Sequence, residues 1–332
     1  MVNAAPAAAR RGWGLVLAAA LLGLAASAAS AADYPQRPVR IVVPYAPGGG
    51  TDVVARVLSA TMTAQMPQPV VVENRAGAGG MVGAEAVARS TPDAHTVLFT
   101  NNGFTVLRII APNPSLDIHQ ALSPVTIVAE SPMILMVANA VPARDLREFL
   151  ALARANPGRY DYGSTGTGGV NGMTALMFLR AAGITLNEVP YRGGAPATLD
   201  LAAGRIAMLF DASSTALQTT RGGQARALAV STPHRSPAAP ELPTLQEAGV
   251  PASSSVWMGM FIPSATPPAA RDALHAAIMR ALQDPGLRSR FTELGTDRIP
   301  ALSPAESVPY VAAEVERWEG LLRSAAPPQV AR

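Results

Sequence analysis

The sequence of 332 residues contains neither cysteine nor lysine. Without cysteine, the chain can form no disulfide framework and carries no lipid-modified cysteine. Without lysine, it has no Walker lysine, no Schiff-base lysine and no ammonium nucleophile. These two absences exclude a disulfide-rich secreted fold and the phosphate-loop and Schiff-base chemistries.

Charged residues are also scarce, because they make up only 15% of the chain whereas hydrophobic residues make up 49%. This amount of apolar side chain suffices for one or two packed cores. A chain with so little charge and so much apolar surface is not disordered as a whole.

The first 32 residues have the pattern of a secretory signal peptide. Arg10 and Arg11 precede an apolar, alanine-rich run over residues 15–26, and small residues follow up to Ala32. A retained membrane anchor would need about 20 apolar residues, and this run ends sooner. We predict a signal peptide over residues 1–32, cleaved after Ala32 or at a rival site after Ala28, and export of the remaining chain to the periplasm.

The net charge argues against nucleic acid as a partner. Loss of Arg10 and Arg11 would lower the basic residues from 26 to 24 against 23 acidic ones, so the net charge would fall from +3 to +1. The sequence pI of about 9.7 reflects arginines that are scattered along the chain. No stripe of aromatic and basic residues accompanies them, as a nucleic-acid surface would require.

Short apolar runs alternate with helical patterns in the first hundred residues of the predicted exported chain. Strands are predicted at 39–44, 70–73 and 96–100, with helices at 51–66 and 81–89 between them. This order indicates a parallel sheet with helices on both faces. The first helix has a predicted buried stripe of Val53, Val54, Val57, Leu58 and Met62. Its predicted polar side holds Asp52, Arg56 and Gln65.

A second series of strands and helices follows and predicts a second lobe. After a strand at 125–137, its strands are expected at 160–163, 187–190, 206–210 and 227–231, and its helices at 144–155, 170–181 and 196–203. A further strand at 256–262 and helices at 268–283, 285–294 and 305–323 form too small a core alone. We therefore expect them to complete the first lobe, so that lobe 1 comprises residues 33–130 plus 252–332 and lobe 2 comprises residues 131–251.

The loop at 44–52 joins the first strand to the first helix and contains three consecutive glycines, Gly48 to Gly50. Backbone N–H groups exposed at a helix N-terminus form a ready site for an anion. A phosphate loop would place Lys after glycine, whereas Asp52 here would repel polyphosphate. The alternative interpretation is a plain strand-to-helix turn with Thr51 or Asp52 as the N-cap.

The loop at 162–169 also follows a strand and precedes a helix, and it carries the hydroxyls of Ser164, Thr165 and Thr167. In open α/β sheets, ligands lie outside the carboxyl ends of the strands, so the two loops should face one cleft. Turn chemistry alone remains the alternative for this loop.

Other motifs carry weaker signals. Residues 77–83 depart from the dinucleotide fingerprint at Val82 and are interpreted as a helix-opening turn. Ser164 does not lie in a G-x-S-x-G motif, and no histidine motif marks a base for it. No metal-binding motif and no cofactor motif is present. Asp211, after the strand at 206–210, could select a ligand amine or hydroxyl, although capping of a helix at 213–220 is the favoured interpretation.

Six blocks of sequence resemble one family in collinear order. They read RPVRIVVPYAPGGGTD at 37–52, VENRAGAGG at 72–80, ANPG at 155–158, YGSTGTG at 162–168, VPYRGGAP at 189–196 and LPTLQEAG at 242–249. The chain thereby resembles the Bug-type substrate-binding proteins of tripartite tricarboxylate transporters. The resemblance covers essentially the whole predicted exported chain.

The resemblance implies an α/β fold of the two-lobed, type II-like periplasmic binding proteins. Each lobe would be a mainly parallel sheet flanked by helices, and the chain would cross the hinge twice. Such a protein is not an enzyme and needs no cofactor. It would close over a small organic acid held by one carboxylate, act as a monomer, and deliver the acid to the membrane subunits of a tripartite tricarboxylate transporter.

The resemblance also assigns residues to the ligand by position. The first wall would be formed by Ala46, Pro47, Gly48 and Gly49. The second lobe would contribute Ser164, Thr165, Thr167 and Gly168. The variable end of the ligand would face Asp211 and the turn of Gly193, Gly194 and Ala195.

Two positions depart from the family pattern. His95, within Asp-Ala-His-Thr at 93–96, stands where the family typically has Asp-Gly-Tyr-Thr, and Gly172 stands where His often follows Asn. The carboxylate-binding end therefore agrees with the family, whereas the specificity end does not. An exported hydrolase or isomerase of carboxylates and a solute sensor for a membrane receptor remain the alternative functions.

Overall fold

The structure is a computed structural model that describes residues 34–110, 116–166 and 168–325. The predicted signal peptide at 1–32 lies outside these residues. The strands are β1 (Val39–Val43), β2 (Val70–Asn74), β3 (Thr96–Asn101), β4 (Leu122–Ala138), β5 (Asp161–Ser164), β6 (Asn187–Pro190), β7 (Met208–Ala212), β8 (Ala225–Val230) and β9 (Ser255–Pro263).

Most helices begin within two residues of their predicted starts. They are α2 (Gly50–Gln65), α3 (Met81–Ala88), α6 (Leu146–Ala155), α7 (Val170–Ala182), α8 (Gly194–Ala202), α9 (Ser213–Arg221), α10 (Pro268–Gln283), α11 (Pro285–Glu293) and α12 (Pro304–Ala325). Short helices α4 (Leu107–Ile110) and α5 (Ile118–Ala121) and the 3₁₀ turns Ala78–Gly80 and Asn102–Val106 were not predicted. They are shorter than the window in which an apolar period can be recognised.

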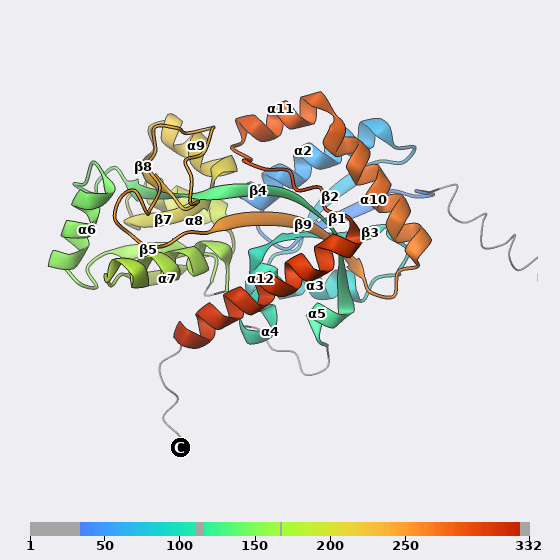
Figure 1. The fold of residues 1–332 in the computed structure, drawn as a ribbon, viewed down its shortest axis with the longest axis horizontal. Helices are drawn as coiled ribbons and strands as arrows, with labels where there is room; N and C mark the ends of the chain where they lie inside the picture. Colours follow the sequence, from blue (N-terminus) through green and yellow to red (C-terminus); the bar gives the residue numbers. More distant parts are fainter. Residues whose placement is uncertain (1–33, 111–115, 167, 326–332) are drawn as a thin grey trace, which may run out of the picture.

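The strands form one continuous sheet in the order β2-β1-β3-β9-β4-β7-β5-β6, with β8 also paired to β4. β1 pairs in parallel with β2 and β3, and β5 pairs in parallel with β6 and β7. Between these parallel groups, β4 and β9 run antiparallel to each other and extend from one half of the molecule to the other (Figure 1). The predicted two-lobed α/β fold class is confirmed.

β4 belongs to both halves, and the predicted lobe boundary after residue 130 falls within its predicted strand at 125–137. Residues 122–132 pair with β9, whereas from Met133 onward β4 pairs with β7 and β8. We name the part with β1 to β3, α2 to α5 and α10 to α12 the first half, and the part with β5 to β8 and α6 to α9 the second half. The two predicted lobe boundaries lie within four residues of Met133 and Ser255.

The core forms where the apolar stripe was predicted on α2. Val54, Leu58 and Met62 are fully buried, while Val53 and Val57 are half-buried. Asp52 was placed on the polar side of α2, but its side chain is buried. This prediction was wrong because hydrogen bonds from neighbouring loops, which helical periodicity does not reveal, compensate the buried carboxylate.

The C-terminal helix α12 packs on strands of the first half. Glu314 on α12 accepts hydrogen bonds from the indole nitrogens of Trp257 on β9 (3.0 Å) and Trp318 (2.9 Å). α12 therefore packs on the strand that returns from the second half (Figure 1). Within the described ranges, no helix has the length and apolar character needed to span a membrane.

Candidate functional site

Asp52 holds the turn between β1 and α2 in place, but it is not the N-cap of α2. The N-cap of α2 is Gly49, which provides no side-chain acceptor. Asp52 Oδ2 accepts from the Gly48 N–H (2.9 Å) and from Arg56 Nε (2.8 Å), and Oδ1 accepts from Asn74 Nδ2 (2.8 Å). The alternative interpretation of Thr51 or Asp52 as N-cap is thus wrong, and the Gly48 N–H is already engaged.

Three further polar residues lie above this turn. Tyr45 donates its hydroxyl proton to Asn101 Oδ1 (2.9 Å), and Asn101 Nδ2 donates to Thr51 Oγ1 (2.8 Å). Burial raises the pKa of Tyr45 to about 12, so the phenol stays neutral at physiological pH. The chain of bonds orients the Thr51 hydroxyl at the first turn of α2.

The second glycine turn is built around Ser164, at the end of β5. Ser164 is fully buried, donates to Glu188 Oε1 (2.5 Å) and accepts from the Gly166 N–H (3.1 Å). Gly172 on α7 lies directly behind, because a Cβ there would be 2.7 Å from the Gly166 carbonyl oxygen. In this structure Ser164 shapes the turn, and its predicted contact with a ligand stays a prediction.

Thr165 and Asn171 connect this turn to Asp211. Thr165 Oγ1 donates to Asn171 Oδ1 (3.3 Å), and Asn171 Nδ2 donates to the Phe210 carbonyl (2.6 Å) and to Asp211 Oδ1 (3.2 Å). The second half thus holds its own network of neutral donors beside the acid.

Asp211 is buried, and no cationic side chain in the described part of the chain forms an ion pair with it. Its carboxylate also accepts from the hydroxyls of Thr215 (2.6 Å) and Thr198 (3.2 Å) and from the Ala212 N–H (2.9 Å). Burial raises the pKa of Asp211, although these hydrogen bonds favour the charged form. The favoured prediction of a helix cap was wrong, because the N-cap of α9 is Ala212 and it has no side-chain cap bond.

A cavity of about 30 Å³ lies between the two turns, and we call it the inner cavity. Four helix N-termini line it: Gly49 to Asp52 of α2, Val170 and Asn171 of α7, Gly194 of α8, and Ala212 at the start of α9. None of these four helices has a side-chain cap, since their N-caps are Gly49, Gly169, Gly193 and Ala212.

Uncapped helix N-termini leave backbone N–H donors without partners and carry the positive end of the helix dipole. Away from the cavity, α6 and α11 are capped by Asp145 and Asp284, whereas α3 and α10 also have no side-chain cap. These four helix ends favour an anionic group, and Arg56 compensates the charge of Asp52, which also lines the cavity.

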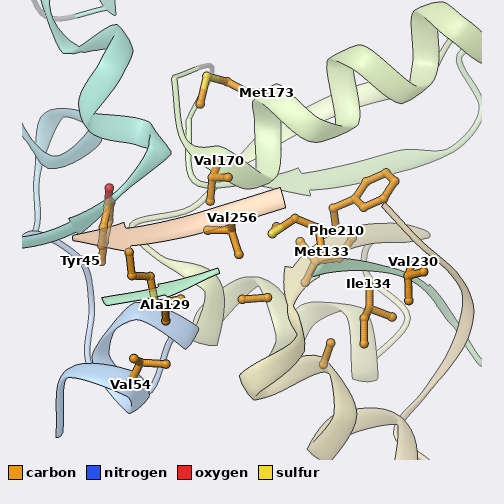
Figure 2. Close-up of a cluster of buried hydrophobic side chains, with 14 of the residues drawn as sticks. Tyr45, Val54, Ala129, Met133, Ile134, Val170, Met173, Phe210, Val230 and Val256 are labelled. Carbon is orange, nitrogen blue, oxygen red and sulfur yellow. The ribbon is translucent and has the colours of Figure 1, made fainter. Parts of the chain in front are cut away.

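The floor of the inner cavity is apolar. Met133 of β4, Val170 of α7 and Val256 of β9 line it, and Figure 2 shows them between Tyr45 on one side and Phe210 on the other. β4 and β9 therefore place an apolar surface below the donors of the helix ends. An apolar wall strengthens the electrostatic attraction between these donors and a bound charge.

The two halves touch directly beside the inner cavity. A Cβ on Gly193 would lie 2.9 Å from Ala46 Cβ, and a Cβ on Gly48 would lie 3.7 Å from Ala195 Cβ. At Gly50, a Cβ would lie 2.7 Å from both Ala212 Cβ and Ser214 Oγ. The glycines at 50 and 193 permit this close approach, so the structure represents a closed arrangement of the halves.

A larger cavity of about 480 Å³ adjoins the inner one, and we call it the outer chamber. Its walls include the glycine turn at 77–80 from the first half and Thr165, Gly166, Tyr191 and Arg192 from the second half. The motif at 77–83, interpreted as a helix-opening turn, indeed precedes α3, whose N-cap is Gly80.

The structure divides the predicted site residues into groups. Gly49, Thr165 and Asp211 line the inner cavity, whereas Ala46, Gly48, Gly193 and Ala195 form the contact between the halves. Pro47 is exposed, and Gly168 packs against Ile110, whose Cδ1 would be 2.2 Å from a Cβ at that glycine. Thr167 lies outside the described residues.

Sequence reasoning missed Tyr45, Asn101 and Asn171 as wall residues. Tyr45 lies within the glycine-rich block at 37–52, and Asn171 follows the block at 162–168 within one helical turn. Their closeness to these blocks was the sequence signal that could have identified them. Asn101 follows β3 with no motif around it, and only the pairing of β3 beside β1 brings it to Thr51.

Histidines do not approach either cavity. His95, at a position that departs from the family pattern, packs edge-on against Tyr34 with 4.9 Å between ring centroids, and its Nδ1 lies 2.9 Å from the Asp93 carbonyl. These contacts hold the chain just before β3, and His95 lines neither cavity. In the part of the chain that the structure describes, no group of three or more His, Asp or Glu side chains could hold a metal ion.

Comparison with known proteins gives one family. Residues 54–326 match the family described as "Tripartite tricarboxylate transporter family receptor". Among curated relatives, Protein BugT of Bordetella pertussis is 34% identical over 307 residues, which cover 92% of this chain and 94% of BugT.

Two solved structures share the fold at similar identity. The periplasmic binding protein BugD is 32% identical with a TM-score of 0.83, over 88% of this chain and 98% of BugD. MatC from Rhodopseudomonas palustris, solved with bound malate, is 32% identical with a TM-score of 0.81, over 87% of this chain and 99% of MatC.

Proposed function

The chain belongs to the family of tripartite tricarboxylate transporter receptors, and from this premise we propose that it is a periplasmic solute-binding protein. It captures a small carboxylate-bearing solute by closure of its two halves and delivers it to the membrane subunits of a tripartite tricarboxylate transporter. In this role it binds without catalysis. Its relatives BugD, a periplasmic binding protein, and MatC, with bound malate, support this assignment.

The observation that carries the proposal is the convergence of four uncapped helix N-termini on the inner cavity. The cavity has room for a carboxylate and not for a whole organic acid, because roughly 10–15 Å³ is needed for one water. A carboxylate there would accept from first-turn N–H groups of α2 and from the Thr51 hydroxyl, whose proton is free because its oxygen accepts from Asn101. The Thr165 hydroxyl would turn to it from its long bond to Asn171 (3.3 Å). Each charge-assisted bond contributes about 1.5–3 kcal/mol, so several offset the desolvation of one carboxylate.

Closure is the step that assembles this site. α2 belongs to the first half and α7, α8 and α9 to the second, so only the closed arrangement lets all four helix ends reach one anion. We place the hinge where β4 changes partners near Met133 and where β9 begins at Ser255, close to the predicted boundaries after 130 and 251. The acid thus stabilises the closed form that a membrane partner would recognise.

A screen of acids tests the binding step. Malate, glutamate, adipate and benzoate are added to the purified chain, and the melting temperature is measured, because binding to the native state raises it. The acid with the largest shift is then titrated calorimetrically, and its chemical fate is followed by mass spectrometry. We expect binding with no turnover. Absence of binding by every acid would refute the proposal, and turnover would favour the hydrolase or isomerase.

A glycine variant tests closure. Gly50→Val places side-chain atoms against Ala212 and Ser214 of the other half, but only when the halves are closed. We expect at least a tenfold loss of affinity for the acid selected in the screen, with small-angle scattering showing less compaction on binding. Gly320→Val, at an open position on α12, is the matched control. Equal affinity of Gly50→Val and wild type would contradict closure as the binding step.

Delivery needs a separate measurement. The acid-loaded chain, immobilised on a resin, should retain the large membrane subunit of a tripartite tricarboxylate transporter from detergent-solubilised membranes. Retention of a receptor kinase in its place would assign the sensor function.

A further inference from the structure

The contact between the two halves reaches the outer surface of the molecule. Gly48 of the first half faces Ala195 of the second, since a Cβ on Gly48 would lie 3.7 Å from Ala195 Cβ. Pro47 and Gly48 are exposed and Ala195 is half-buried, so this line of contact is open to solvent. All three residues present apolar atoms or bare backbone there.

Leu199 is the most exposed large hydrophobic residue in the described part of the chain, at 71%. It follows Ala195 by one helical turn on α8, so both side chains lie on the same face of that helix. Because a helical side chain leans toward the N-terminus of its helix, Leu199 extends over Ala195, which faces Gly48. A single exposed leucine is common on protein surfaces, but this one continues an apolar line of contact. We call Pro47, Gly48, Ala195 and Leu199 the seam surface.

The seam surface depends on closure of the halves. Pro47 and Gly48 belong to the turn between β1 and α2 in the first half, whereas Ala195 and Leu199 belong to α8 in the second. When the halves separate, the two parts of this surface separate with them. A partner that contacts both parts at once therefore distinguishes the closed form from the open form.

The charges beside the seam surface are mainly positive. In the first half, Arg56 pairs with the buried carboxylate of Asp52 (2.8 Å), and in the second half Arg205 pairs with Asp200. Arg192, three residues before Ala195, is exposed and forms no ion pair within the described ranges. The two acids are thus already engaged, and Arg192 leaves an excess of positive charge next to apolar atoms.

We propose that the seam surface, together with Arg192, is the docking site for a loop of the membrane subunit that carries an apolar side chain beside a carboxylate. This inference rests on the proposed function, because it supplies the contact through which the acid-loaded form is delivered. The apolar side chain packs on Leu199 and Pro47, and the carboxylate pairs with Arg192. Opposite charges on two surfaces speed their association. Anionic lipid fits less well, since lipid recognition uses clusters of about four to eight basic residues.

A matched pair of variants tests the seam surface. Leu199→Asp places a charge in it, and Val308→Asp makes the same change on α12, where Val308 is 55% exposed. Each chain is saturated with the acid selected in the screen, and its binding to the purified membrane subunits in nanodiscs is measured by biolayer interferometry. We expect Leu199→Asp to bind at least tenfold more weakly than wild type, because it loses the burial of a leucine side chain. Val308→Asp should bind as wild type does, and calorimetry should give both variants the wild-type affinity for the acid.

Charge and closure are tested in the same assay. Rising salt should weaken binding of the wild-type chain to the nanodiscs. Arg192→Gln, at saturating acid, should bind more weakly and depend less on salt. The acid-free wild-type chain should bind the membrane subunits more weakly than the acid-loaded chain.

The inference is overturned if Leu199→Asp binds as wild type does, if Val308→Asp is weakened equally, or if the acid-free chain binds as well as the loaded one. It is also overturned if nanodiscs of anionic lipid alone retain the chain equally, which would assign the surface to the membrane. In these outcomes the acid still binds, so the binding step of the proposed function stands. A wild-type chain that binds no acid, or no membrane subunit, would refute the proposed function and this inference with it.

Discussion

The two halves of the molecule each bring one buried aspartate to the same cavity, and they treat it in opposite ways. Asp52 of the first half bonds to the Arg56 guanidinium, whereas Asp211 of the second half has only neutral donors. For Asp52, burial favours the neutral acid, but the bonds from Arg56, Gly48 and Asn74 outweigh it and the pKa is lowered. For Asp211, burial prevails and the pKa is raised.

This difference shows that burial alone does not set the charge of an acid beside a binding site. Arg56, together with the bonds from Gly48 and Asn74, lowers the pKa of Asp52 despite its burial. Asp211 responds to its surroundings, because any anion bound in the inner cavity would further favour its neutral form. The first half therefore presents an acid paired with a cation, and the second half an acid held by neutral donors.

The largest expected effect is on stability. Asp52→Asn removes the charge that holds Arg56 and the Gly48 N–H, and we expect the free energy of unfolding to fall by about 2 kcal/mol at neutral pH. Asp211→Asn should change it by less than about 1 kcal/mol, because an amide of equal size replaces an acid whose ionisation is disfavoured. Urea denaturation measures both. Asp272→Asn, at an exposed pair with Arg271, is the control. Similar losses in the two variants would contradict the comparison.

The pH dependence of the same variants should have opposite signs. Asp52 has a lowered pKa in the folded state, so its contribution is present above its unfolded pKa of about 3.9 and is lost as the pH falls through its folded pKa. Asp211 has a raised pKa, so the folded state holds its proton above about 3.9 and stability is lost as the pH rises through the folded pKa.

Relative to wild type, Asp52→Asn should therefore become less stable with rising pH, and Asp211→Asn more stable. Both differences should be smaller than the effect of Asp52→Asn at neutral pH. Thermal denaturation at a series of pH values checks the two slopes. Slopes of the same sign would show that the two acids do not differ as described.

The next effect separates two hydroxyls of the second turn. Thr165 lines both cavities, whereas Ser164 donates to Glu188 and is fully buried. We expect Thr165→Val to weaken binding of the acid selected by thermal shift about tenfold, and Ser164→Ala less than threefold. Calorimetry measures both affinities. A larger loss in Ser164→Ala would restore the sequence-based assignment of Ser164 as a direct ligand contact.

The smallest effect concerns Gly172. A Cβ there would lie 2.7 Å from the Gly166 carbonyl, so Gly172→Ala should displace the turn and weaken binding of the same acid about threefold. Gly320→Ala on α12 meets open space and should instead stabilise the chain by up to about 1 kcal/mol without changing affinity. An unchanged affinity in Gly172→Ala would mean that the position of the turn at 164–166 is not important for binding.

Much of the architecture follows from local patterns in the sequence. The alternation of apolar runs with helical periods predicted the two-lobed fold, and the return of the chain through β9 followed from the small size of the C-terminal core. The predicted boundary after residue 130 divides the strand at 125–137, but the partners of β4 were not predicted, because periodicity marks a strand and not its partners. One strand of 17 residues can serve two halves when its pairing changes along its length.

The sequence by itself determined the fold and the position of two glycine turns at helix starts, because these features depend on residues close together in the chain. Only the tertiary structure decided which donors remain available. The Gly48 N–H already donates to Asp52, and the Ser164 hydroxyl already donates to Glu188. Arg192 of the second half and the turn at 77–80 of the first half line one cavity. Contacts between distant segments decide these points, and hydrophobic periodicity carries no record of them.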